Sequence, residues 1–330
     1  MRVLVTGGTG YLGGAIVRAL IRRDDEAVVF SRRIPAPSSG LGATGVTYLA
    51  GDIRDRDAIA RAARGVDAII HLAALVSVWR PRAADFDDVN VGGLRHVIEV
   101  CRAQRIRRLI YTSSFLALPP AGRDQAIRAN DYQRTKVEAR DVARAAAADG
   151  APIVTLYPGV IYGPGAATEG NLVGRLVRDH LARRLPGIIG ADRIWCFSFI
   201  DDAVAAHLRA LTVPADGEEI AIGGENAAQI RLFEIVREHR GVALPRRIPS
   251  AVAYAAGAVD EVRARLTGRP PLLTRGVVTI FSHDWPLDST RSVDLVGSQP
   301  TSLADGMRVT LGSDRGQTGD RAGSDPADMP

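Results

Sequence analysis

The residue pair with the clearest chemistry in this sequence is Tyr132 and Lys136, in the segment Asp-Tyr-Gln-Arg-Thr-Lys at 131–136. Residues four apart share one face of a helix, so a helix through this segment would place the phenol beside the ammonium group. A free tyrosine has a pKa of about 10, and a nearby cation favours the phenolate and lowers that pKa. The pair therefore predicts an acid/base centre that moves a proton to or from a substrate oxygen.

Lys136 is the only lysine in a chain that holds 42 basic residues. Arginine serves wherever a surface cation is enough, so the lysine favours a role that needs a compact point charge rather than a planar fork. The alternative explanation is an ordinary charged position on a solvated helix face.

A second chemical feature is the run Tyr111-Thr112-Ser113-Ser114, which ends an apolar, strand-like segment. A hydroxyl there would hydrogen-bond a substrate oxygen and hold it against the tyrosine. Ser114 is the better candidate and Ser113 the second. Serines are common at strand ends, so this assignment depends on the tyrosine–lysine pair.

A glycine-rich turn, Thr-Gly-Gly-Thr-Gly-Tyr-Leu-Gly at 6–13, follows the first expected strand and opens the first expected helix. Glycine allows a sharp turn at Gly7, close approach of a pyrophosphate near Gly10, and tight helix packing at Gly13, while the helix N-terminus donates N–H groups to the phosphates. A flexible turn without a ligand is the alternative. The turn predicts a dinucleotide site whose contacts are Gly7, Thr9, Gly10, Tyr11, Leu12 and Gly13.

The second strand ends at Ser31-Arg32-Arg33, where a carboxylate would bind the ribose 2′-hydroxyl of NAD(H). Two arginines suit a 2′-phosphate instead, so NADP(H) is favoured and NAD(H) remains an alternative. Two surface arginines without a ligand, in a chain rich in arginine, are the alternative explanation. Asp52 and Ile53 follow the third strand and are expected at the adenine edge, although Asp52 could be a simple turn residue.

The elements that must position these residues alternate between strand and helix up to about residue 160. This rhythm predicts an α/β Rossmann fold, a doubly wound parallel sheet covered on both faces, with a smaller, mainly helical C-terminal substrate lobe. We expect an NAD(P)-binding domain over 1–160, with some later segments returning to it, a substrate lobe over 161–311 and a disordered tail over 312–330. The expected strands are 2–6, 26–31, 46–50, 68–73, 109–113 and 153–157, and the expected helices lie near 11–23, 55–63, 85–104 and 131–149.

Composition excludes several classes of function. The net charge is +5, but the arginines are scattered and aromatic residues make up only 5%, so no nucleic-acid partner is expected. The histidines show no paired ligand spacing, so no metal is expected, and Cys101 and Cys196 are expected to be buried free thiols. No apolar run approaches the roughly 18–20 residues of a membrane span. The chain starts in a strand pattern, which predicts a cytoplasmic protein; its partner would be a small-molecule substrate, with a homodimer left open.

Together these residues resemble the extended short-chain dehydrogenase/reductase family, which includes the NAD-dependent epimerases and dehydratases. The resemblance covers about residues 1–312 and rests on the glycine turn, the strand end His-Leu-Ala-Ala at 71–74, the hydroxyl run at 112–114 and the Tyr-x-x-x-Lys motif. Stretches such as Leu-Tyr-Pro-Gly-Val-Ile-Tyr-Gly-Pro-Gly at 156–165 look most like dihydroflavonol-reductase-like and farnesol-dehydrogenase-like members. The resemblance implies that catalysis is carried by Ser114, Tyr132 and Lys136, and that Ala73, Ala74, Pro158 and Val160 border the cofactor.

The activity that follows is reversible hydride transfer between a nicotinamide and an alcohol or carbonyl carbon. An apolar substrate, of isoprenoid or polyketide type, is suggested by seven apolar residues of the lobe that would otherwise be ordinary core: Leu172, Val173, Leu176, Ile188, Ile189, Trp195 and Phe197. One alternative is a nucleotide-sugar epimerase or dehydratase with tightly bound NAD, in which Arg193 or Arg231 would grip a diphosphate. Another is a protein that senses the cofactor without turnover.

The substitution Lys136→Arg tests the special role of the lysine. We expect it to abolish turnover although the positive charge is kept, because a guanidinium fork does not reproduce the geometry of an ammonium group. The measurement is the steady-state rate of the purified variant beside the wild type. Near-normal activity would contradict the assignment.

Overall fold

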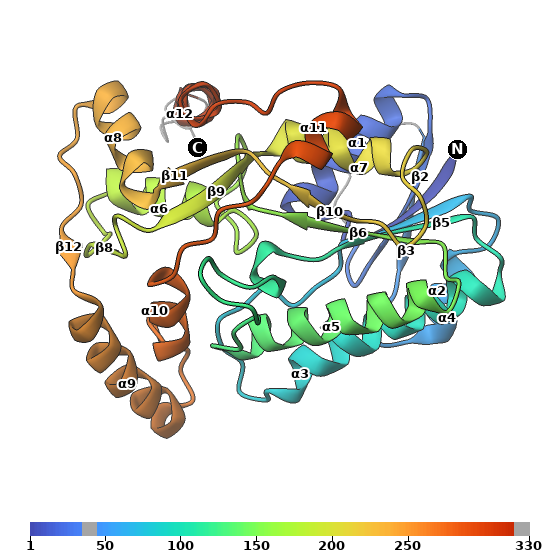
Figure 1. The fold of residues 1–330 in the computed structure, drawn as a ribbon, viewed down its shortest axis with the longest axis horizontal. Helices are drawn as coiled ribbons and strands as arrows, with labels where there is room; N and C mark the ends of the chain where they lie inside the picture. Colours follow the sequence, from blue (N-terminus) through green and yellow to red (C-terminus); the bar gives the residue numbers. More distant parts are fainter. Residues whose placement is uncertain (35–44, 320–330) are drawn as a thin grey trace, which may run out of the picture.

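The centre of the molecule is a seven-stranded sheet in which every strand pairing is parallel. The computed structural model describes residues 1–34 and 45–319 of the chain (Figure 1). In spatial order the strands are β3 (Val46–Ala50), β2 (Glu26–Ser31), β1 (Arg2–Thr6), β4 (Ala68–His71), β5 (Arg108–Thr112), β6 (Ile153–Pro158) and β10 (Glu219–Ile222). The chain order reverses between β1 and β4, and a ligand binds beyond the carboxyl ends of the strands at such a point. The predicted fold class is confirmed.

Helices cover both faces of this sheet (Figure 1). Each face is lined by a separate apolar core cluster, because strands buried on both sides carry apolar residues at nearly every position. On one face lie α1 (Tyr11–Arg22), α7 (Ile200–Ala210) and α11 (Thr290–Val296). On the other lie α2 (Arg56–Ala62), α4 (Gly93–Ala103) and α5 (Asp131–Ala148). Both cysteines are buried and free, as expected.

The smaller region contains the helices that were expected of the lobe and, in addition, several short strands. Short strands form there because the buried backbone N–H and C=O groups of the chain need hydrogen-bond partners after it leaves the main sheet. The strands are β7 (Val160–Tyr162), β9 (Ile194–Phe199) and β11 (Glu225–Ala228) in one sheet, and β8 (Ile188–Ile189) and β12 (Arg247–Ile248) in another. The helices are α6 (Leu172–Leu181), α8 (Gln229–Arg240), α9 (Ser250–Thr267), α10 (Arg275–Phe281) and α12 (Leu303–Gly319).

Two predicted segments differ in detail. The helix expected over 85–104 is divided into α3 (Ala84–Phe86), a π-helical turn η2 (Asp87–Gly92) and α4. The first eight residues of the tail that was expected to be disordered are helical, since α12 is anchored by buried Leu303, Met307 and Leu311 and continues to Gly319. The remainder of that tail, 320–330, lies outside the described residues.

Candidate active site

The glycine turn between β1 and α1 is built for close backbone approach. Gly7 has φ +74°, which favours glycine, and a Cβ there would lie 2.8 Å from the backbone nitrogen of Ala73. A Cβ on Gly13 would lie 2.2 Å from the carbonyl oxygen of Gly7. Gly10 caps α1 without a side-chain hydrogen bond, and the first turn holds no acidic residue. The N–H groups at this helix end therefore fit the pyrophosphate of a dinucleotide.

Two residues to which the sequence motifs assigned no role of their own, Thr6 and His71, join the strand ends at this point. The Oγ1 atom of Thr6 lies 2.7 Å from Nδ1 of His71 and accepts a hydrogen bond from the backbone nitrogen of Ala73 at 3.3 Å. Burial holds the pKa of His71 at about 3, with the nearby charge of Lys136 adding to the effect. The sequence could have revealed this pair, because a hydroxyl residue and an imidazole residue each stand at the end of an expected strand. Together they fix Ala73 beside the glycine turn.

The predicted adenine side lies at the ends of β2 and β3. Arg32 and Arg33 are exposed, and the Ser31 hydroxyl donates to the carbonyl of Arg33 at 2.7 Å. The carboxylate of Asp52 accepts from Nε and Nη2 of Arg54 at 3.0 and 2.7 Å, and this bonding lowers its pKa. Asp52 thus has a structural partner of its own, and its contact with adenine stays a prediction.

The predicted catalytic residues come together where β5 ends and α5 begins. Tyr132 is half-buried, and a hydrogen bond with the Ser114 hydroxyl acts on its pKa. Lys136 lies one turn further along α5 and is only 4% exposed. Its Nζ atom donates to the carbonyl oxygen of Thr112 at 3.2 Å and lies 5.5 Å from the centroid of the Tyr111 ring.

Burial dominates the electrostatics of this pair. It raises the pKa of Tyr132 to about 12, against the opposing effect of the Ser114 hydrogen bond. It also lowers the pKa of Lys136 to about 8. The net shift of the phenol pKa in the protein alone is upward, because the loss of hydration outweighs the Ser114 hydrogen bond, and the lowering of that pKa by Lys136 stays a prediction. At neutral pH the phenol is protonated and able to donate.

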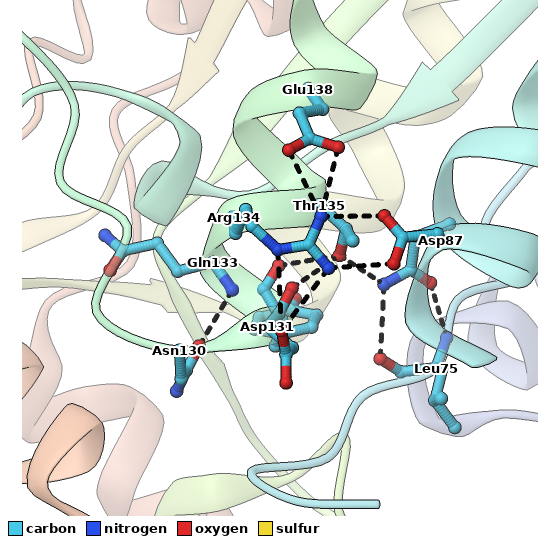
Figure 2. Close-up of polar contacts among 10 residues, drawn as sticks. Leu75, Asp87, Asn130, Asp131, Gln133, Arg134, Thr135 and Glu138 are labelled. Carbon is cyan, nitrogen blue, oxygen red and sulfur yellow. Dashed lines mark hydrogen bonds and ion pairs between the residues drawn. The ribbon is translucent and has the colours of Figure 1, made fainter. Parts of the chain in front are cut away.

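A network of polar side chains fixes the start of α5 (Figure 2). Arg134 forms a two-pronged ion pair with Asp87 in the π-helical turn, at 2.7 and 2.8 Å. Asn90 in the same turn donates to the Thr135 hydroxyl at 2.9 Å and accepts from the backbone nitrogen of Leu75 at 2.7 Å. The π-helical turn therefore holds the loop after β4 against the helix that carries Tyr132 and Lys136.

A further pair of contacts holds the loop after Ser114. Asn130 caps α5 by accepting from the backbone nitrogen of Gln133 at 2.8 Å (Figure 2). The fully buried Gln133 side chain donates to the carbonyl of Leu116 at 3.1 Å and accepts from the backbone of Ala129 at 3.0 Å. The hydroxyl of Ser114 accepts from the backbone nitrogen of Leu116 at 3.2 Å. The serine and the tyrosine are thus positioned by one connected set of hydrogen bonds.

The smaller region holds a small apolar cavity that is partly open to solvent, and its empty space is about 280 Å³ when that solvent is included. Six of the seven apolar residues named from the sequence line it, and Ile189 does not. Val160, which was expected to border the cofactor, also lines it. Phe115, next to Ser114, packs against Trp195 with ring centroids 5.8 Å apart. The lining is Val160, Leu172, Val173, Leu176, Ile188, Trp195, Phe197, Gln229, Leu232, Phe233 and Phe281.

The arginines that could grip a diphosphate are occupied elsewhere. Arg193 pairs with Asp284 at 3.1 Å, and Arg231 pairs with Glu234 and Glu238 at 3.3 and 3.0 Å. Neither lines the cavity, whose single polar side chain, Gln229, donates to the backbone carbonyls of Gly190 and Phe281.

Residues 3–223, which include the glycine turn, the serine and the tyrosine–lysine pair, match the NAD dependent epimerase/dehydratase family. The chain belongs to this family. The resemblance noted from the sequence is thereby confirmed, and with it the nicotinamide dinucleotide as the kind of cofactor that family membership implies. No helix in the described part of the chain is long and apolar enough to cross a membrane.

Two relatives and one solved structure are similar to this chain over nearly its whole length. The 2-alkyl-3-oxoalkanoate reductase of Stenotrophomonas maltophilia is 32% identical, covering 93% of this chain and 98% of its own. Sterol demethylase protein B of Methylococcus capsulatus is 29% identical, covering 92% and 94%. The crystal structure of UDP-glucuronic acid 4-epimerase from Bacillus cereus has the same fold, with a TM-score of 0.76 at 20% identity, covering 96% of this chain and all of that one.

Removing the buried charge should stabilise the protein. Lysine would keep its proton up to about pH 10.4 in the unfolded chain, whereas in the folded chain its pKa is about 8. Below pH 8 both states are protonated and the folded state carries the full cost of desolvation. We expect Lys136→Met to raise the free energy of unfolding at pH 7 by about 1–3 kcal/mol, after the loss of the Thr112 hydrogen bond.

Urea unfolding of the variant and the wild type at several pH values checks this. The gain should shrink as the pH rises from 8 towards the value of free lysine, because the folded wild type then loses its charge. Lys136→Arg, which keeps a buried cation, is the matched control and should show no gain. A Lys136→Met protein that is less stable at pH 7 would show that the ammonium is well solvated or paired.

Proposed function

We propose that this chain is a carbonyl reductase, working reversibly as an alcohol dehydrogenase, that prefers NADP(H) and acts on an apolar substrate. The observation that carries the proposal is the apolar cavity that shares Val160 with the predicted nicotinamide border and meets the catalytic loop through the Phe115–Trp195 contact. Because the cavity has no charged lining residue, it suits an alkyl or ring system better than a nucleotide sugar.

The glycine turn fits the cofactor on structural grounds, since side chains at Gly7 or Gly13 would fill the close approaches described above. The residues that would hold the dinucleotide are Gly7, Thr9, Gly10, Tyr11, Leu12, Gly13, Ala73, Ala74, Pro158 and Val160, with Asp52 and Ile53 at the adenine. When bound, the nicotinamide supplies or accepts the hydride. Arg32 and Arg33 would bind the 2′-phosphate, which supports the preference for NADP(H).

The three polar side chains have distinct tasks in reduction. Ser114 donates a hydrogen bond to the substrate carbonyl and orients it. Tyr132 donates its proton to the same oxygen as negative charge develops there, which its raised pKa permits at neutral pH. Lys136 supplies a buried positive charge beside this centre and a donor for the cofactor ribose. In the oxidation direction Tyr132 takes the proton from the alcohol.

The relatives support an apolar substrate. The name of the Stenotrophomonas relative describes reduction of an oxo group in an alkyl-substituted alkanoate, and that of the Methylococcus relative refers to a sterol. The epimerase alternative is less supported, because Arg193 and Arg231 already pair with carboxylates and the similarity to the Bacillus epimerase shows the fold alone. A sensor without turnover would have no need of the buried lysine.

A chain-length series tests the proposed activity. Purified protein is given NADPH or NADH and ketones of increasing alkyl length, and oxidation of the cofactor is followed by absorbance. We expect kcat/KM to rise by up to about fourfold for each added methylene until the cavity is filled, with NADPH preferred. Ketones of equal length that end in a hydroxyl are the matched control and should gain less. Conversion of a UDP-sugar without net cofactor oxidation would overturn the proposal.

The rate of ketone reduction should also depend on pH. Reduction requires the proton on Tyr132 and the charge on Lys136, and a rising pH removes the lysine proton first, near pH 8. We expect kcat/KM to be level below this pH and to fall tenfold per pH unit above it. A profile of kcat/KM under conditions where the protein stays folded checks this. A level rate from about pH 7 to about pH 10 would show that Lys136 keeps its charge.

A further inference from the structure

Helix α9 presents an apolar face to solvent at the edge of the molecule (Figure 1). The α9 face comprises Val252, Ala255, Val259, Val262 and Leu266, all exposed. Their spacing of three and four residues places them in one stripe along the helix. Leu266 is 82% exposed and Val259 is 72% exposed. Only small residues of α9 are buried: Ala253, Gly257 and Ala264.

The loop that joins α9 to α10 extends this surface. Leu272 is 94% exposed, the highest value among the large apolar residues of the described chain. Six of the twelve exposed large apolar side chains in the described ranges lie on α9 or this loop. Such a concentration is unusual for scattered surface residues and marks an interaction surface.

Helix α9, the loop after it and α10 form a helical hairpin, the α9–α10 hairpin, in which acidic and unpaired basic residues lie on different sides. The two acidic residues of α9 are engaged towards the α10 side: Asp260 accepts from the backbone of Leu273 and pairs with Arg263, and Glu261 pairs with Arg275 at 2.8 Å. Arg265 and Arg269, in contrast, are exposed and have no ion pair among the described residues. The apolar stripe is therefore accompanied by free positive charge, with its negative charge neutralised within the fold.

This combination suits the surface of an anionic lipid bilayer. A helix with an apolar face and unpaired basic residues lies in the plane of the headgroups. The helix is about 27 Å long, so its single stripe is too narrow for a stable protein dimer, which needs about 800 Å² and 20–30 residues on each side. A bilayer imposes no such requirement of shape or area.

We propose that the α9–α10 hairpin docks this protein on anionic membrane surfaces. Phe281 at the end of α10 lines the apolar cavity and contacts Trp195, with the two rings tilted by 49° and their centroids 4.6 Å apart. Gly276 of α10 lies against Ala129, directly before the helix that carries Tyr132. The docked hairpin thus leads from the lipid surface to the cavity, a route by which an apolar substrate avoids crossing water.

Vesicle sedimentation tests the docking and uses no turnover, so it stands apart from the proposed activity. The full protein is mixed with vesicles of phosphatidylcholine, or of phosphatidylcholine and phosphatidylglycerol in equal parts. We expect binding to the anionic vesicles only. Val259→Ser with Leu266→Ser should weaken it at least tenfold, and Arg265→Glu with Arg269→Glu should weaken it about fivefold or more for each charge. Far-ultraviolet circular dichroism verifies that each variant is folded.

Control variants change exposed residues of the same kind elsewhere on the surface. Val213→Ser with Val309→Ser changes two apolar side chains that are about half exposed, and Arg64→Glu changes an exposed arginine; both proteins should bind as the wild type does. No sedimentation with anionic vesicles, or sedimentation untouched by both α9 variants, would overturn the proposal. A dimer in solution that the α9 variants dissociate would overturn it as well, by showing that a second copy covers this face.

Discussion

The structure of the site depends on one energetically unfavourable feature, the burial of the charged ammonium group of Lys136. A charge that is 4% exposed and has a single carbonyl partner has lost most of its hydration. Its pKa falls to about 8 for that reason. The energetic cost is about 3 kcal/mol at neutral pH, which is a large part of the net stability of an ordinary domain. The proposed catalytic role of Lys136 would explain why the chain keeps a charge at this cost.

The surrounding contacts keep α5, the helix that carries Tyr132 and Lys136, in a fixed position relative to the strand ends. The Arg134–Asp87 ion pair and the Asn90–Thr135 hydrogen bond fix the outer side of α5 to the π-helical turn (Figure 2). Gln133 fixes the inner side to the loop after Ser114. A shift of α5 by a fraction of a turn would withdraw the tyrosine from the serine and the lysine from Thr112. The π-helical turn is the element that makes both anchors reachable, because it changes the direction in which its side chains project.

The fold could be predicted from the sequence because local and global signals agree. Apolar runs alternate with amphipathic stretches, and the glycine turn stands at the first strand end, so the order of the sheet followed from known connection rules. The short strands of the lobe were not predicted, since strands of two to six residues that pair across long sequence separations, such as β9 with β11, leave no periodic pattern. The tail was misjudged from 312 to 319 because a helix anchored at Leu303, Met307 and Leu311 extends past its last apolar contact.

The site was predictable in its residue types but not in its electrostatics. Spacing alone places Tyr132 and Lys136 on one helix, yet it carries no information on burial, and burial sets the sign of the Tyr132 pKa shift. The same limit applies to Thr6 and His71, whose pairing depends on adjacent strands 65 residues apart in sequence. The raised pKa of Tyr132 has a consequence for the direction of the proposed reaction. In the proposed reduction, a phenol that keeps its proton at neutral pH would act directly as the acid, whereas the proposed oxidation would first require that proton to be removed.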